Sequence, residues 1–228
     1  MKKYFLYLIA IPFFVAACGG GGGGDSGSGS VQTNADASGF WSDPTSDNYG
    51  ILITKSGEIW GISLTSPTYT LYKGTVSTKD TTLTGSGSLY DNNTSTSVSI
   101  TGQVVPKSTI KGSATSNGKT SQFSLVYDSN YEITPTTASI AGVYTVSSGG
   151  NITVASNGAL MGSVNGCVIT GTLTPATNEN FFRLSVAYDQ TTCQTNVTAS
   201  GIIGKSGTSL VGGAVAGGRG DAFVLTKQ

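Results

Sequence analysis

One stretch of this chain occurs twice, and this repetition limits the fold more than any other feature. Residues 51–61, ILITKSGEIWG, are followed about 100 positions later by residues 152–162, ITVASNGALMG. Landmarks on both sides keep their order: Gly39-Phe40-Trp41 with Gly142-Val143-Tyr144, Leu89-Tyr90-Asp91 with Ala187-Tyr188-Asp189, and Phe123 with Phe223. We interpret the folded part as one module written twice, against the alternative of chance similarity between Thr/Gly-rich strands.

Both modules have the pattern of short β-strands. Apolar and polar residues alternate with a period of two, and turn dipeptides recur every 8 to 12 residues. In the first module we expect strands at 39–43, 49–55, 58–65, 69–77, 81–90, 97–105, 108–115 and 121–127. In the second, Phe182, Leu184 and Val186 should point inward between outward Arg183 and Ser185. By the same rule Trp60, Ile62 and Leu64 should share an inward row.

These patterns predict an all-β fold of two tandem, internally repeated small antiparallel meander β-barrels, with about eight short strands each. Glycines on the inward rows favour small closed barrels, and closure removes exposed strand edges. Interiors of this size are normally filled by side chains. We place β-module 1 at 39–134 and β-module 2 at 139–228, with the junction near Pro135.

The first 17 residues predict a secretory signal. Lys2 and Lys3 precede an apolar stretch from Tyr4 to Val15, and small residues Ala16 and Ala17 follow it. A membrane-spanning helix needs about 20 apolar residues, more than this stretch supplies. Cys18 comes directly after the small residues, which an ordinary signal peptide does not require.

The segment Val15-Ala16-Ala17-Cys18 resembles the lipobox of bacterial lipoproteins. The resemblance implies that Cys18 is the lipidation site: its sulfur carries a diacylglyceryl group, and in Gram-negative cells its amine carries a further acyl chain such as palmitate. Several acyl chains are needed because one chain gives only marginal membrane binding. Gly19 stands where an aspartate would resemble an inner-membrane retention signal, so we expect the outer membrane, in either leaflet.

Residues 18–38 form the expected acylated cysteine and Gly/Ser-rich tether, which includes the glycine run 19–24. Such a segment behaves as a flexible coil that spans roughly 25 Å. The layout of a tether followed by small β-barrels is loosely similar to Gram-negative surface lipoproteins of the factor H-binding type. That similarity covers the layout only and carries over no binding residue.

The remaining cysteines, Cys167 and Cys193, predict a disulfide in an oxidising compartment, with two free thiols as the alternative. In a meander both cysteines lie at the same end of the second module. The loop from Asp189 to Asn196 must then fold over to bring their Cα atoms within about 7 Å.

The composition gives no support for catalysis. The chain has no histidine, which excludes a Ser-His-Asp arrangement and an imidazole metal site, and its acidic residues are scattered. We therefore expect no enzyme activity, no catalytic residue, no metal and no cofactor. Basic and acidic residues are equal at 12 each, and the absence of a basic run argues against nucleic acid as a partner.

Four tyrosines near strand ends are the candidate binding residues: Tyr49, Tyr69, Tyr72 and Tyr131. Recognition should use loops and the groove between modules, although each tyrosine could instead complete a core. Arg219-Gly220-Asp221 resembles the integrin-binding tripeptide and should lie in an exposed hairpin.

Three hypotheses for function follow. The first is a lipid-anchored outer-membrane lipoprotein that acts as a non-catalytic surface binding module with a protein partner. The alternative is a periplasm-facing structural or assembly component of the bacterial cell envelope. A hydrolase is the remote alternative, because it would need a close pair of carboxylates.

Overall fold

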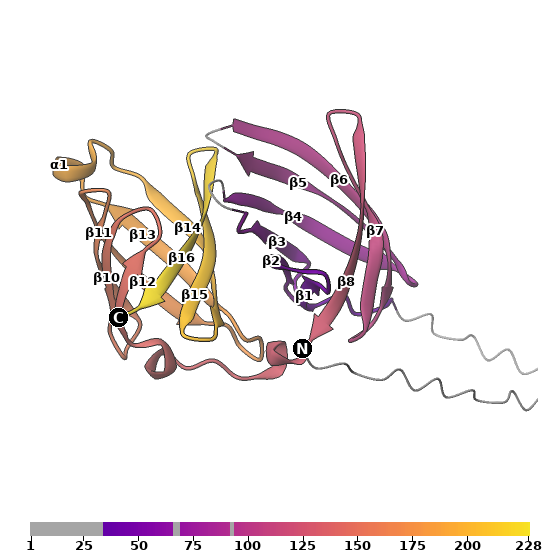
Figure 1. Cartoon of the computed structure of the whole chain (residues 1–228), viewed down its shortest axis with the longest axis horizontal. Helices are drawn as coiled ribbons and strands as arrows, with labels where there is room; N and C mark the ends of the chain where they lie inside the picture. Colours follow the sequence, from indigo (N-terminus) through magenta and orange to yellow (C-terminus); the bar gives the residue numbers. More distant parts are fainter. Residues whose placement is uncertain (1–33, 66–68, 92–93) are drawn as a thin grey trace, which may run out of the picture. The chain divides into compact units, whose positions relative to one another are not determined.

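The computed structural model describes residues 34–65, 69–91 and 94–228, without the side chains of residues 46–48, and shows two closed antiparallel barrels (Figure 1). Barrel 1 consists of β1 Gly39–Asp43, β2 Ser46–Ile53, β3 Glu58–Ser63, β4 Thr70–Lys79, β5 Thr82–Asp91, β6 Thr94–Val105, β7 Thr109–Ser116 and β8 Lys119–Asp128. Barrel 2 consists of β9 Gly142–Val146, β10 Gly150–Val154, β11 Ala159–Val164, β12 Cys167–Pro175, β13 Phe182–Tyr188, β14 Thr198–Ser206, β15 Ser209–Ala216 and β16 Arg219–Lys227.

In each barrel every strand pairs with its neighbours in the chain, and the last strand pairs with the first. The predicted fold class, all-β with two eight-stranded meander barrels, is therefore confirmed. Two short 3₁₀ turns lie between the barrels, η1 at Ser129–Glu132 and η2 at Thr137–Ile140, and one helical turn, α1 at Gln190–Cys193, follows β13.

The strand alternation fills each barrel with apolar side chains. The core of barrel 1 contains Trp41, Ile51, Ile53, Ile59, Tyr72, Leu83, Val98, Ile100, Val104, Ile110 and Leu125. The core of barrel 2 contains Ile140, Tyr144, Val146, Ile152, Val154, Leu160, Ile169, Leu173, Phe182, Leu184, Val186, Ile203, Leu210 and Leu225. Arg183 and Ser185 are exposed between these inward residues of β13, as predicted.

The prediction for Trp60 and Ile62 was wrong. Both are buried, but on the outer face of barrel 1, where they pack with Leu71 and with Phe181 from barrel 2 in a third apolar cluster. Leu64 packs against the same cluster. The inward positions of β3 are Ile59 and Gly61 instead. Because β3 is buried on both faces, alternation reveals its period but not which face is inside.

This third cluster, which we call the interface cluster, joins the two barrels. Its buried members are Leu52, Trp60, Ile62, Leu71, Tyr131, Phe181, Ile202 and Ala222. Polar contacts accompany it: Arg183 Nη1 lies 2.9 Å from Glu58 Oε2, and the Lys55 backbone N–H donates to Glu179 Oε1 at 2.8 Å. The groove expected between the modules is therefore filled by side chains.

The duplicated hairpins have the same hydrogen bonds. In barrel 1 the carbonyl oxygen of Gly57 accepts from the Val76 backbone N–H at 2.8 Å. In barrel 2 the carbonyl oxygen of Gly158 accepts from the Leu173 backbone N–H at 2.7 Å. Both glycines have a positive φ, 80° and 86°, which a side chain would oppose. The repeat in the sequence therefore corresponds to a repeat in backbone geometry.

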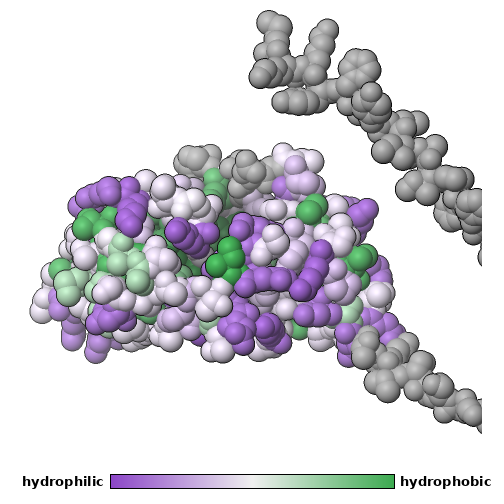
Figure 2. Space-filling view, turned by 90° about the horizontal axis from the view of Figure 1, so that it is seen from below, coloured by the Kyte–Doolittle hydropathy of each residue, from purple (hydrophilic) through white to green (hydrophobic). Residues whose placement is uncertain are grey.

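Outside the cores, hydrophobic side chains are dispersed. Figure 2 shows one face of the molecule, on which they form small separate groups among hydrophilic residues. The large hydrophobic residues with exposed side chains come from both barrels and the connection between them: Val105, Val126, Ile133, Val143, Met161, Val168 and Val197. The large buried hydrophobic side chains belong to the three clusters.

Candidate functional site

The wall of barrel 1 is incompletely closed between its first and last strands. β8 has ten residues, but β1 pairs only with its last three: Phe40 lies opposite Asp128, Trp41 opposite Tyr127 and Ser42 opposite Val126. The pairing stops because β1 turns away from β8 immediately after Ser42.

The turn is determined by the sequence Asp43-Pro44-Thr45. The register of β1 against β2 shifts between Ser42 and Asp43. The Asp43 carboxylate accepts hydrogen bonds from the backbone N–H of Thr45 at 2.8 Å and from its hydroxyl at 2.6 Å, which lower the pKa of Asp43. Pro44 has no N–H to donate to a neighbouring strand. These residues end β1 and leave the first part of β8 without a partner on this side.

The hydrogen-bonding pattern of the β7–β8 hairpin shows which backbone groups of β8 do not bond to β7. Its two-residue turn, Asn117-Gly118, places Ser116 opposite Lys119. In such hairpins the closing pair and every second pair after it are hydrogen-bonded. The odd-numbered residues from Lys119 to Leu125 therefore direct their N–H and C=O groups toward β7. Thr120, Gln122 and Ser124 direct theirs toward the gap, where no strand in the described part of the chain pairs with them.

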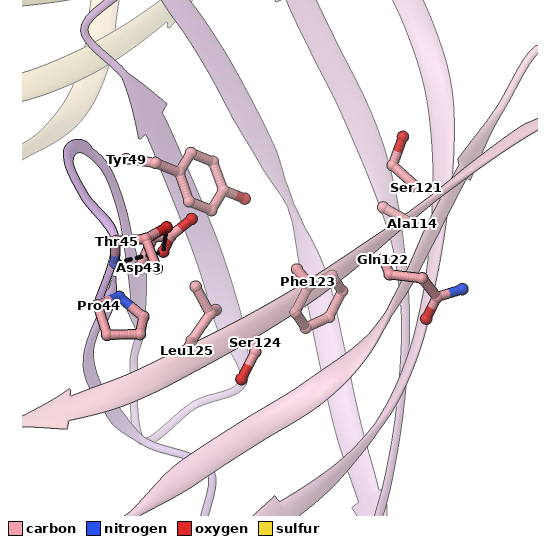
Figure 3. Close-up of a pocket in the computed structure, with 10 residues that line it drawn as sticks. All are labelled: Asp43, Pro44, Thr45, Tyr49, Ala114, Ser121, Gln122, Phe123, Ser124 and Leu125. Atoms are coloured by element: carbon pink, nitrogen blue, oxygen red, sulfur yellow. Dashed lines mark hydrogen bonds between the residues drawn. The ribbon is translucent and has the colours of Figure 1, made fainter.

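Behind this edge lies a cavity of about 560 Å³, open to solvent, between β8 and the β1–β2 turn (Figure 3). Tyr49 extends from β2 on one side of the opening, and Phe123 and Leu125 lie on β8 on the other. The lining is completed by Asp43, Pro44, Thr45, Ala114, Ser121, Gln122 and Ser124.

A second cavity of about 400 Å³ adjoins the first at the end of the barrel, since Tyr49, Ala114 and Ser121 line both. Its apolar lining includes Tyr72, Leu89, Val98 and Ile100, and its polar residues are Ser63, Thr70, Ser116, Asn117 and Lys119. The expectation that side chains fill the barrel completely was therefore wrong for this end of barrel 1. The reason is the short β1, which leaves one part of the wall without a strand.

Two of the four candidate tyrosines meet in this hollow end. Burial raises the pKa of Tyr49 to about 12. Burial and the neighbouring Tyr49 raise the pKa of Tyr72 to about 12 as well. The Tyr72 hydroxyl is buried and has no hydrogen-bond partner among the described residues. Both phenols are neutral at physiological pH, so each can donate a hydrogen bond.

The other two candidates lie in the interface cluster. Tyr69 packs against its edge, and Tyr131 is 4 % exposed, with its hydroxyl donating to Glu179 Oε1 at 2.6 Å. Burial, followed by the bond to Glu179, raises the pKa of Tyr131. Tyr131 therefore completes a core, as the alternative interpretation had it. Sequence reasoning did not identify Phe123, which lines the opening, or Phe181, which belongs to the interface cluster, as site residues.

The disulfide between Cys167 and Cys193 is present, with Cα atoms 4.7 Å apart. The loop after β13 folds over as α1, whose N-terminus is capped by Asp189. That carboxylate accepts hydrogen bonds from Thr191 and Thr192, which lower its pKa. The predicted pairing and the position of the loop agree with the structure.

The tripeptide Arg219-Gly220-Asp221 lies in the hairpin between the last two strands, as expected, with Arg219 and Asp221 exposed. The turn before it is Gly217-Gly218, and the tripeptide begins β16, paired with β15. A Cβ atom added to Gly220 would lie 2.7 Å from the Tyr90 ring, so this residue packs closely against barrel 1.

The predicted signal peptide, Cys18 and the tether up to Thr33 lie outside the described residues. No helix in the described part has the length and hydrophobicity of a transmembrane span. Within the same ranges no group of three or more acidic or cysteine side chains is placed to hold a metal ion. No protein family model, curated protein or solved structure matches this chain.

Proposed function

We propose that the chain is a lipid-anchored bacterial outer-membrane lipoprotein that acts as a non-catalytic binding module on the cell surface. The anchor is Cys18, followed by the tether of residues 18–38. The observation that supports binding is the hollow end of barrel 1, where Tyr49 and Tyr72 lie in adjoining cavities that open to solvent. Such concave, largely apolar sites with a few polar groups are the usual form of binding sites.

The anchor and the location are tested on whole cells. Mass spectrometry of the native N-terminus should find acyl chains on Cys18, and a Cys18→Ala variant should leave the membrane fraction. Protease added to intact cells should remove the wild-type protein. Protection from that protease, together with co-purification with outer-membrane complexes, would instead support the periplasm-facing structural component. A bare thiol at Cys18 would refute the lipoprotein assignment.

The binding role is tested by filling the hollow end. Ala114 lines both cavities, so Ala114→Trp should occlude them. Ala187→Trp is the matched control, because Ala187 is exposed on barrel 2. Immobilised wild type and Ala187→Trp should retain a partner from an extract of the host environment, and Ala114→Trp should lose it. Equal retention by all three proteins would contradict the assignment of the site.

A further inference from the structure

We propose that barrel 1 binds an extended segment of another polypeptide, which adds to the free edge of β8 as an extra strand and closes the opening in the wall. This inference rests on the proposed binding function and names its class of partner. Two observations support it: the row of backbone groups on β8 with which no strand among the described residues pairs, and the cavity directly behind that row.

The unpaired backbone groups of β8 favour an extended chain as the partner. Thr120, Gln122 and Ser124 present N–H and C=O groups at intervals of two residues, about 6.6–6.8 Å in a strand. Another extended backbone presents donors and acceptors at the same interval, and this is how peptides bind by strand addition. A compact small molecule would satisfy few of these six groups. Thr120, Gln122 and Ser124 are exposed, so their edge is open to a partner.

The cavity has room for the side chains that the added strand would direct into the barrel. Successive side chains of an added strand would point alternately out to solvent and into the barrel. The inward ones would enter the space of about 560 Å³ lined by Tyr49, Phe123 and Leu125. This lining favours a segment with apolar residues at every second position. Polar residues suit the outward positions, because they would lie beside exposed Gln122 and Ser124.

The repeat shows what happens to the equivalent edge in barrel 2. β9 pairs only with residues 225–227 of β16, and Ser147 adds a bond to Val224, so closure is incomplete there too. However, the preceding part of β16 is packed against barrel 1: Ala222 is 3 % exposed within the interface cluster. The corresponding part of β8 is bare and polar on its outer face. A second copy of this chain is therefore a poorer occupant of the β8 edge. The contact that covers the equivalent edge of β16 depends on a small apolar surface, which the outer face of β8 lacks.

The first test selects peptides on the purified full chain in detergent. A phage-displayed library of random heptapeptides should yield binders with alternating apolar residues. Gln122→Pro removes one N–H on the open edge, a position at which a strand tolerates proline. It should weaken binding of the selected peptides about tenfold, because one hydrogen bond is lost and its acceptor on the peptide is left unsatisfied. Gln122→Thr keeps the N–H and should therefore lose much less affinity than Gln122→Pro.

Melting temperatures equal to that of the wild type would show that both variants are folded. Hydrogen exchange, measured on the wild type, tests strand addition without any variant. Addition of a selected peptide should slow exchange of the backbone amides of Thr120, Gln122 and Ser124. No enrichment of peptides, equal affinity for Gln122→Pro, or unchanged exchange along β8 would overturn strand addition. Lipid on Cys18 with no peptide binding would refute this inference alone, whereas peptide binding with a bare thiol would refute only the anchor.

Discussion

Replacing Cys167 and Cys193 by serine should lower the free energy of unfolding by about 3.5 kcal/mol. The bond joins residues 26 positions apart in sequence. In the chain-entropy model, a cross-link over a loop of this length removes about 12 cal/mol/K from the unfolded chain, which is about 3.5 kcal/mol at 25 °C. The native loop should persist without the bond, because Asp189 caps α1 and the Val168 backbone N–H donates to the Thr192 hydroxyl at 2.9 Å.

Urea unfolding measures this effect. With a slope of about 2 kcal/mol/M, the midpoint of the double-serine variant should fall by about 1.8 M relative to the oxidised wild type. Reduced wild type should unfold at the same midpoint as the variant, and reductant should not change the variant itself. Equal midpoints for oxidised and reduced wild type would refute the reasoning. They would mean that the cross-link does not restrict the unfolded chain, or that strain in the folded state cancels the gain.

Three further predictions concern the cores. Phe181→Ala, which truncates a fully buried ring of the interface cluster, should cost about 3–5 kcal/mol in urea unfolding, whereas Met161→Ala, at a side chain 60 % exposed, should change stability by less than about 0.5 kcal/mol. Gly87→Ala should lower the melting temperature, because the new Cβ would lie 2.3 Å from a backbone carbonyl oxygen; Gly50→Ala, with only one contact at 3.9 Å, should leave it nearly unchanged. Burial raises the pKa of Tyr72 to about 12. The stability that its neutral phenol contributes is therefore complete below pH 10 and is lost as the pH rises to 12. Tyr72→Phe should reduce this loss, which urea unfolding midpoints measured from about pH 9 to 12 would show.

The sequence predicted what depends on local pattern. Alternation from Phe182 to Tyr188 identified β13 and its inward face, because this strand is buried on one side and exposed on the other. The same rule failed for β3, whose residues Ile59 to Ile62 are buried on both faces. The outer face of β3 is buried by contact with barrel 2, whose residues are distant from β3 in the sequence. Periodicity within one strand therefore carries no information about it.

The opening in barrel 1 depends on how far two strands pair, which alternation does not report. A partial signal was present: the strand expected at 39–43 is shorter than the one at 121–127 with which it must close the barrel, and Pro44 follows it directly. A five-residue strand cannot cover a ten-residue partner. Comparing the lengths of the first and last strands would therefore have predicted an unpaired edge, although not the cavity behind it.

Duplication gives the two barrels the same incomplete closure but different surroundings. In barrel 2, Gly220 and Ala222 place that half of β16 against barrel 1, and the small side chains allow the close approach. In barrel 1, the equivalent half of β8 carries polar residues and remains accessible. The interface between the barrels thus covers one of the two edges and leaves the other available for a partner. For this reason we expect binding to be confined to barrel 1, whereas substitutions in barrel 2 should act through stability.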